Sequence, residues 1–117
     1  MGARRGHEYL EGLDDDREVW YGAERINVAE HPVFAGSVRG MADYFDYQWE
    51  HQDDCLFPSP DTGDLISVAH LRPRNDDDIA RRHRAFDRFA RYSVGMLGRT
   101  PDYVNVVLAG HVSRTDL

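Results

Sequence analysis

The chain has 117 residues, enough for one domain with a modest core, and its 41% hydrophobic content is far above that of a disordered chain. Its net charge of −7 argues against a nucleic acid as the main partner, because phosphate binding needs a basic surface. No apolar run approaches the ~20 residues of a membrane span, and no signal-peptide core follows Met1. We therefore expect a cytoplasmic protein that binds neither nucleic acid nor membrane.

The first half of the chain is predicted to hold two helices around a pair of short strands. The first helix covers 7–13, and the strands cover 19–21 and 26–28. The second helix begins near Pro32, which suits the first helical position, and ends in the run 51–54. The link between the strands is too irregular to predict a hairpin type.

The second helix is predicted to bury one apolar stripe. Its members recur at spacings of three and four: Phe34, Val38, Met41, Phe45 and Trp49. Gly36 and Gly40 form a small-residue pair on the same helix, from which we expect a close backbone approach by a neighbouring element.

Two further strands are predicted in the middle of the chain. They cover 55–57 and 65–71, and the turn-forming segment 58–63 connects them. The second of them is mostly apolar, so we expect it to be covered on both faces.

The third helix is predicted over 76–97, with Asn75 as its N-cap and Gly98 as the residue that ends it. Its predicted inner stripe contains Ile79, His83, Phe86, Ala90, Val94 and Leu97. Its predicted outer stripe contains Arg81, Arg84, Arg88 and Arg91. Because the chain is acidic and no aromatic residues alternate with these arginines, a solvated or domain-facing surface is favoured over a nucleic-acid site.

The junction between the third and fourth helices places an arginine and a tyrosine near one helix end. If Thr100 is the N-cap and Pro101 the first helical residue, Arg99 precedes the helix and Tyr103 lies in its first turn. Free backbone N–H groups and the helix dipole there favour an anion or a polarised oxygen near Arg99. The Tyr103 hydroxyl can supply a second hydrogen bond. Spacing alone is more typical of a linker charge and a half-buried aromatic.

The fourth helix carries Val104, Val107 and Leu108 and is predicted to fade near Gly110. An apolar helix at a C-terminus needs a partner. We expect that partner to be either the rest of this domain or a piece outside the chain.

Cys55 is the only cysteine, so no internal disulfide can form, and a buried, unreactive thiol is expected. The run 51–55 contains three kinds of metal ligand. Adjacent donors on an irregular segment rarely close a metal shell, so no metal site is predicted.

Five segments extend the analysis beyond single residues: 8–13, 31–34, 60–63, 71–74 and the Gly-Arg-Thr-Pro-Asp-Tyr run 98–103. Together, in this order, they closely resemble the 4-hydroxyphenylacetate 3-monooxygenase oxygenase-component family. The resemblance implies an α+β, helix-dominated fold: the N-terminal domain of an acyl-CoA-dehydrogenase-like flavoprotein, with short β-hairpins between helices. Residues 1–117 would form that domain, and the family's β-rich middle and helical C-terminal domains would be absent.

The resemblance also implies an activity. The family's enzymes are two-component monooxygenases of aromatic compound catabolism, which use O2 and reduced FAD from a separate flavin reductase. They hydroxylate a phenol such as 4-hydroxyphenylacetate ortho to its hydroxyl. Arg99 and Tyr103 match the family positions that bind the phenolic hydroxyl, and are therefore the expected catalytic and substrate-binding residues. The family's third such residue is a histidine further along, which this chain does not reach.

Further implications are that the flavin-binding residues mostly lie downstream, that this segment alone is inactive, and that the full-length form is a homo-oligomer. Three alternatives stay open: a truncated or split non-catalytic fragment, a stand-alone binding module, and the related 4-hydroxybutyryl-CoA dehydratase branch. The dehydratase branch uses cysteine ligands for an iron–sulfur cluster. Residues 98–110 contain no cysteine, which favours the hydroxylase branch.

Overall fold

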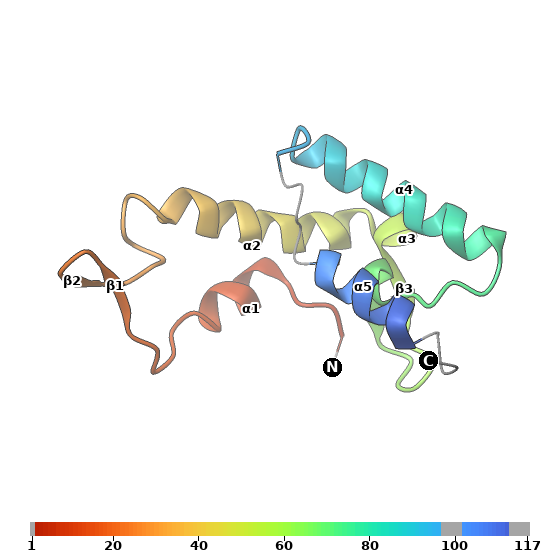
Figure 1. Cartoon of the computed structure of the whole chain (residues 1–117), viewed down its shortest axis with the longest axis horizontal. Helices are drawn as coiled ribbons and strands as arrows, with labels where there is room; N and C mark the ends of the chain where they lie inside the picture. The colour runs from red at the N-terminus through yellow and green to blue at the C-terminus, as the bar shows by residue number, and fades with distance from the viewer. Residues whose placement is uncertain (1, 97–101, 113–117) are drawn as a thin grey trace. The chain divides into compact units, whose positions relative to one another are not determined.

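The computed structural model describes residues 2–96 and 102–112, and in them helices dominate while the strands form two short antiparallel pairs (Figure 1). The elements in order are α1 (Gly6–Glu11), β1 (Val19–Tyr21), β2 (Glu24–Ile26), α2 (Ala35–Glu50), α3 (Gln52–Cys55), β3 (Leu56–Pro58), β4 (Leu65–Ser67), the 3₁₀ helix η1 (Val68–His70), α4 (Asp76–Tyr92) and α5 (Asp102–Val112). The chain divides into two units. One is Arg4–Glu50, and the other is His51–Leu117 together with Met1–Ala3. No helix in the described ranges combines the length and apolar character needed to cross a bilayer.

In the first unit, α1 packs closely on α2. The backbone N–H of Gly6 donates to Asp46 Oδ1 over 2.8 Å, and the rings of Tyr9 and Phe45 lie 5.3 Å apart. A Cβ at Gly6 would lie 2.5 Å from Asp46 Oδ2 and 2.6 Å from the carbonyl oxygen of Ala42. The close approach therefore depends on a glycine at position 6.

The close approach predicted at Gly36 and Gly40 is wrong. A Cβ built at either glycine meets no described atom within 4 Å. Two small residues four positions apart allow a neighbour to come close but do not require it. The close approach to α2 occurs instead at Gly6 of α1.

The hairpin of β1 and β2 confirms the strand predicted over 19–21 and corrects the other one. Val19 pairs with Ile26 and Tyr21 pairs with Glu24, so the second strand lies two residues earlier than predicted. Gly22 takes a φ of +64°, and it forms the two-residue turn with Ala23. A turn this short fixes the register, because the strands must pair immediately on either side of it.

Helix α2 begins at Ala35, after a turn in which the N–H groups of Phe34 and Ala35 both bond to the His31 carbonyl. Its buried residues are Val38, Ala42, Tyr44 and Gln48. Of the predicted stripe only Val38 is fully buried. A small alanine and a polar glutamine carry no hydrophobic signal, so the centre of the buried face could not be predicted from periodicity.

In the second unit, β3 and β4 pair antiparallel, with Leu56 opposite Ser67 and Pro58 opposite Leu65. The strand predicted over 65–71 ends at Ser67, because its hydroxyl oxygen accepts a bond from the Ala69 N–H and starts η1. Cys55 is fully buried, as predicted, at the end of α3.

The first turn of α4 is as predicted. The Asn75 side chain accepts from the Asp78 N–H over 2.9 Å, and three aspartates follow the cap. The helix ends at Tyr92 instead of Leu97, because Gly95 takes a φ of +72° and donates its N–H to the Ala90 carbonyl over 2.8 Å. Leu97 and Gly98 lie outside the described residues.

The predicted inner stripe of α4 is wrong at most of its positions, whereas the predicted outer stripe is exposed at Arg84 and Arg91, as expected. Its buried residues are Ala85 and Phe89, whereas Ile79 is 44% exposed and Val94 is 85% exposed. Within the predicted inner stripe, His83 and Ala90 are also exposed and Phe86 is half-buried. Two arginines of the predicted outer stripe, Arg81 and Arg88, are half-buried instead. The aliphatic part of an arginine side chain can cover apolar surface while its guanidinium is hydrogen-bonded. A prediction from hydrophobic periodicity treats arginine only as polar and misses this.

Helix α5 packs against η1. The residues predicted to be its apolar stripe are largely exposed: Val104, Val107 and Leu108. Asn105, Val106 and Ala109 are half-buried instead. Thr100 and Pro101, the predicted start of this helix, lie outside the described residues.

Candidate functional site

The predicted site lies at the N-terminal end of α5. Arg99 lies outside the described residues. The backbone of Tyr103 belongs to the first turn of α5, and its side chain lies outside the described part of the chain. What the structure gives is the frame that carries α5 and, with it, position 103.

That frame is η1, which holds α5 in place through a polar contact. Asn105 Nδ2 on α5 lies 3.3 Å from His70 Nε2 on η1. Val68 and Ala69, which precede His70, are fully buried. The N-terminal part of α5 is therefore attached to a well-anchored turn. Sequence reasoning missed this pair, because the two residues are 35 positions apart and show no local spacing.

An open hollow of about 340 Å³ lies beside His70. Its floor is apolar, with Phe57, Ile66 and Leu71, and its lining also includes Arg72 and Arg74. The segment after η1 is tied to α4, since the Arg74 N–H donates to Asp78 Oδ2 over 2.8 Å.

The arginine stripe of α4 forms a charged cluster with α3. Arg88 Nε donates to Asp54 Oδ2, and Arg84 Nε lies 3.6 Å from Asp54 Oδ1. Arg88 Nη1 also lies 3.3 Å from His51 Nδ1. The hydrogen bond from Arg88 is the main cause that lowers the pKa of the Asp54 carboxyl, against an opposing effect of burial. These charges hold two helices together.

A second arginine of α4 contacts the chain just after the segment 51–55: Arg81 Nη2 donates to the carbonyl oxygen of Leu56 over 2.7 Å. Within the described residues, no three His, Cys, Asp or Glu side chains converge as a metal-binding group.

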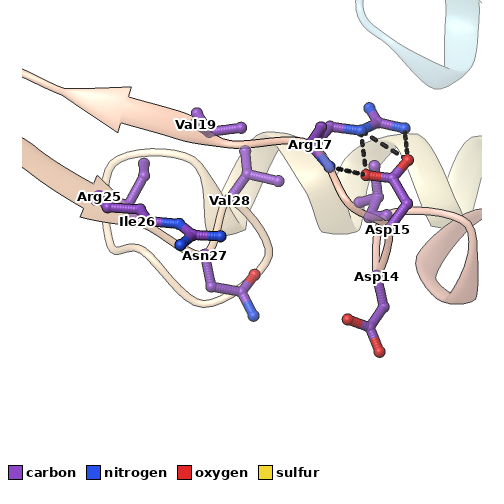
Figure 2. Close-up of a pocket in the computed structure, with 9 residues that line it drawn as sticks. Asp14, Asp15, Arg17, Val19, Arg25, Ile26, Asn27 and Val28 are labelled. Atoms are coloured by element: carbon purple, nitrogen blue, oxygen red, sulfur yellow. Dashed lines mark hydrogen bonds and ion pairs between the residues drawn. The ribbon is translucent and has the colours of Figure 1, made fainter.

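A second hollow, of about 320 Å³, lies in the first unit beside the β1–β2 hairpin (Figure 2). Its two arginines are already paired. Arg17 Nε donates to Asp15 Oδ1 over 2.6 Å, and Arg25 Nη1 lies 3.2 Å from Glu18 Oε1. The hydrogen bonds from Arg17 lower the pKa of the Asp15 carboxyl.

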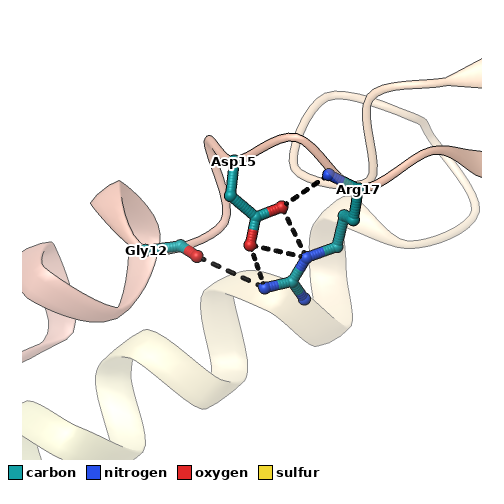
Figure 3. Close-up of polar contacts among 3 residues, drawn as sticks. All are labelled: Gly12, Asp15 and Arg17. Atoms are coloured by element: carbon teal, nitrogen blue, oxygen red, sulfur yellow. Dashed lines mark hydrogen bonds and ion pairs between the residues drawn. The ribbon is translucent and has the colours of Figure 1, made fainter.

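Figure 3 shows the geometry of this pair, in which the Arg17 guanidinium faces the Asp15 carboxylate and its Nη2 also reaches the carbonyl oxygen of Gly12 at 3.5 Å. The ion pair between Arg17 and Asp15 stabilises the bend between α1 and β1. The hollow is therefore lined by charges that neutralise each other.

Comparison with known proteins identifies the family. A family model described as 4-hydroxyphenylacetate 3-hydroxylase N terminal matches residues 5–117. The chain is 37% identical over 107 residues to the 4-hydroxyphenylacetate 3-monooxygenase oxygenase component of Geobacillus sp. (strain PA-9), covering 90% of this chain and 22% of that protein. It is 34% identical over 116 residues to the corresponding component of Thermus thermophilus, covering 97% of this chain and 24% of that protein.

Solved structures agree with the sequence relatives. The oxygenase component of 4-hydroxyphenylacetate 3-monooxygenase, complexed with FAD and 4-hydroxyphenylacetate, superposes with a TM-score of 0.85 at 33% identity. The superposition covers 95% of this chain and 24% of that one, so the chain spans about a quarter of the length of its relatives. The chain therefore belongs to the family of 4-hydroxyphenylacetate 3-hydroxylase N-terminal domains, and its fold is the N-terminal part of the acyl-CoA-dehydrogenase-like fold of these oxygenase components.

Proposed function

We propose that residues 1–117 are the N-terminal, substrate-binding domain of a monooxygenase. The whole enzyme would use reduced FAD and O2 to hydroxylate a phenol ortho to its hydroxyl. Support comes from the family match over residues 5–117, which includes both Arg99 and Tyr103. It also comes from the related oxygenase component that was solved with FAD and 4-hydroxyphenylacetate. The partners of the whole protein would be a phenolic substrate, a separate flavin reductase and the downstream domains, in a cytoplasmic homo-oligomer.

Small-molecule sites enclose most of a ligand's surface, whereas the hollows beside His70 and beside the β1–β2 hairpin are open depressions. The hairpin hollow is lined by arginines that are already paired. Neither hollow therefore supports a flavin site, and the flavin and its oxygen chemistry would be supplied mainly by residues downstream.

The contribution of this chain would be to hold and activate the phenol. A free phenol has a pKa near ~10 and is hardly ionised at neutral pH. A guanidinium at Arg99 within about 4–6 Å of the phenolic oxygen would lower that pKa by ~1–3 units. The phenolate is richer in electrons at its ortho carbon, so it reacts more readily with an electrophilic oxygen donor. Tyr103 would fix the orientation of the ring through a second hydrogen bond to the same oxygen.

Replacing Arg99 by Ala in the full-length protein tests the proposal. Because each unit of pKa is worth about 1.4 kcal/mol, we expect kcat/KM for hydroxylation to fall by roughly 10- to 1000-fold with reduced FAD supplied. Tyr103→Phe should lose about tenfold, the value of one hydrogen bond. Arg39→Ala, at an exposed position of α2, is the matched control and should behave like wild type. Unchanged turnover and unchanged phenol affinity in Arg99→Ala would remove Arg99 from the mechanism.

A further inference from the structure

Helix α5 is attached to the rest of its unit by contacts that are unusual for an apolar helix. Its large side chains at Val104, Val107 and Leu108 are 58%, 42% and 55% exposed, so they contribute little packing in the described structure. Its half-buried residues are Asn105, Val106 and Ala109. Apolar contacts alone do not strongly fix the rotation of a helix about its own axis, because the hydrophobic effect is not directional.

A hydrogen bond is directional, and Asn105 makes one at the face where α5 meets η1. Asn105 Nδ2 lies 3.3 Å from His70 Nε2. The contact lies in the first half of the helix, two residues after Tyr103 and six after Arg99. A bond at this position sets how far the N-terminal end of α5 is rotated.

The other half of the pair stands on a rigid support. Before His70, Val68 and Ala69 are fully buried, and the Ser67 hydroxyl caps the turn by accepting from the Ala69 N–H over 3.3 Å. After it, the Leu71 N–H donates to the Val68 carbonyl over 2.9 Å. His70 itself is exposed, yet its backbone is held on both sides.

We infer that His70 and Asn105 act as a pair of positioning residues for the phenol-binding position 103. The inference rests on the proposed function. All residues of a rigid helix turn together, so the bond that fixes Asn105 also fixes the direction in which position 103 projects.

The chemistry of the pair suits a constant positioning role. An asparagine amide can donate through Nδ2 or, after rotation about its last bond, accept through Oδ1. It can therefore form a hydrogen bond with either form of an imidazole ring, neutral or protonated. The pair can hold α5 in the same orientation in either state.

Four variants of the full-length protein test the inference: Asn105→Leu, His70→Phe, the double variant, and His70→Gln, which keeps a side-chain amide near the position of the ring nitrogen. Phenol affinity, flavin affinity, kcat and melting temperature are measured for each, beside Arg99→Ala. His111→Phe is the matched control, since it removes an exposed histidine from the last turn of the same helix.

We expect each single loss of the bond to weaken phenol binding roughly three- to tenfold, the range of one neutral hydrogen bond. The double variant should be no weaker than either single one, because both remove the same interaction. His70→Gln should keep most of the affinity. Flavin affinity should not change in any of them, and His111→Phe should match wild type.

The outcomes separate the two claims. Normal phenol affinity in Asn105→Leu and His70→Phe, with a large loss in Arg99→Ala, overturns the positioning pair and leaves the proposed function standing. Normal behaviour of Arg99→Ala overturns the proposed function itself. Losses that add up in the double variant, or a lowered melting temperature with normal phenol affinity, show that the residues do not act as a positioning pair. If Asn105→Leu does not fold, His70→Phe at the exposed partner carries the same comparison.

Discussion

Gly6 decides how closely α1 can approach α2. The Gly6 N–H bonds to Asp46, and the space that a Cβ would need is already occupied by a carboxylate oxygen and by the Ala42 carbonyl. The carbonyl belongs to helical backbone and cannot move aside as a side chain can. We predict that Gly6→Ala lowers the free energy of unfolding by about 1–3 kcal/mol, the usual cost of overpacking. Urea denaturation of the chain measures it.

Gly40→Ala is the matched control in the same unit. Its Cβ would meet no described atom within 4 Å, and alanine is a better helix former than glycine in the middle of α2. We expect the free energy of unfolding to rise by about 0.5–1 kcal/mol. Equal effects of the two substitutions would show that position 6 is not under steric constraint.

Asp54 makes the stability of the second unit depend on pH. Its carboxylate accepts a hydrogen bond from Arg88, and this bond lowers the pKa of the folded state below the ordinary value of 3.8. A lowered folded-state pKa means that the ion pair stabilises the fold fully above that ordinary value. The contribution is lost as the pH falls through the folded-state pKa.

We therefore predict that Asp54→Asn lowers the free energy of unfolding by about 1 kcal/mol at neutral pH, since the carboxylate is partly shielded from water. The difference from wild type should shrink as the pH falls below 3.8 and through the lowered pKa of Asp54, because protonation removes the charge that the asparagine lacks. Denaturation curves at neutral pH and at acid pH measure it. Asp53→Asn, at the exposed neighbouring position, should have little effect at either. A difference at Asp54 that persists at low pH would contradict the role of the ion pair.

At the scale of the element, α4 shows which features could be predicted from local sequence. Its start was predictable, because Asn75 and the three aspartates after it act on backbone groups within four residues. Its end was not, because Gly95 and Gly98 are both suitable terminators by sequence, and the bond from Gly95 to Ala90 comes from the structure. Arg88 and Arg81 contact Asp54 and Leu56, which are far away in sequence, so periodicity could not predict that these arginines are half-buried.

The same reasoning applies to the candidate site. The family segment that contains Arg99 and Tyr103 was recognisable from consecutive residues. The contact between Asn105 and His70 depends on how α5 lies on η1, and nothing in either segment indicates the other. The motif therefore predicts which residues touch a substrate, and this stays a prediction, whereas the contact between α5 and η1 came from the tertiary structure.

The cap of α4 can be tested as an element. Asn75 Oδ1 accepts from the Asp78 N–H, which has no partner within the helix. We predict that Asn75→Ala costs about 1 kcal/mol of unfolding free energy and speeds amide exchange in the first turn of α4. Asn75→Ser keeps a cap oxygen and should lose much less. Equal losses in the two variants would mean that the cap bond contributes nothing.

At the scale of the whole molecule, the chain covers about a quarter of the length of its relatives, and two hollows of its described part are open. The proposed phenol-binding positions 99 and 103 lie within the chain, whereas the resemblance places most flavin contacts downstream. The substrate and the cofactor would then be bound mainly by different segments of the polypeptide.

We predict that the 117-residue chain alone binds FAD, oxidised or reduced, no more tightly than about 100 µM. A flavin lying in an open hollow would keep much of its surface in water, and little affinity would remain after the entropy lost on association. Titration of the chain followed by flavin fluorescence and calorimetry measures the affinity, with the full-length protein as the positive control. Saturable binding at about 1 µM or tighter would contradict the prediction, since it needs about 8 kcal/mol from these residues alone. Such tight binding would instead favour a stand-alone flavin-binding module over a domain that binds only the phenol.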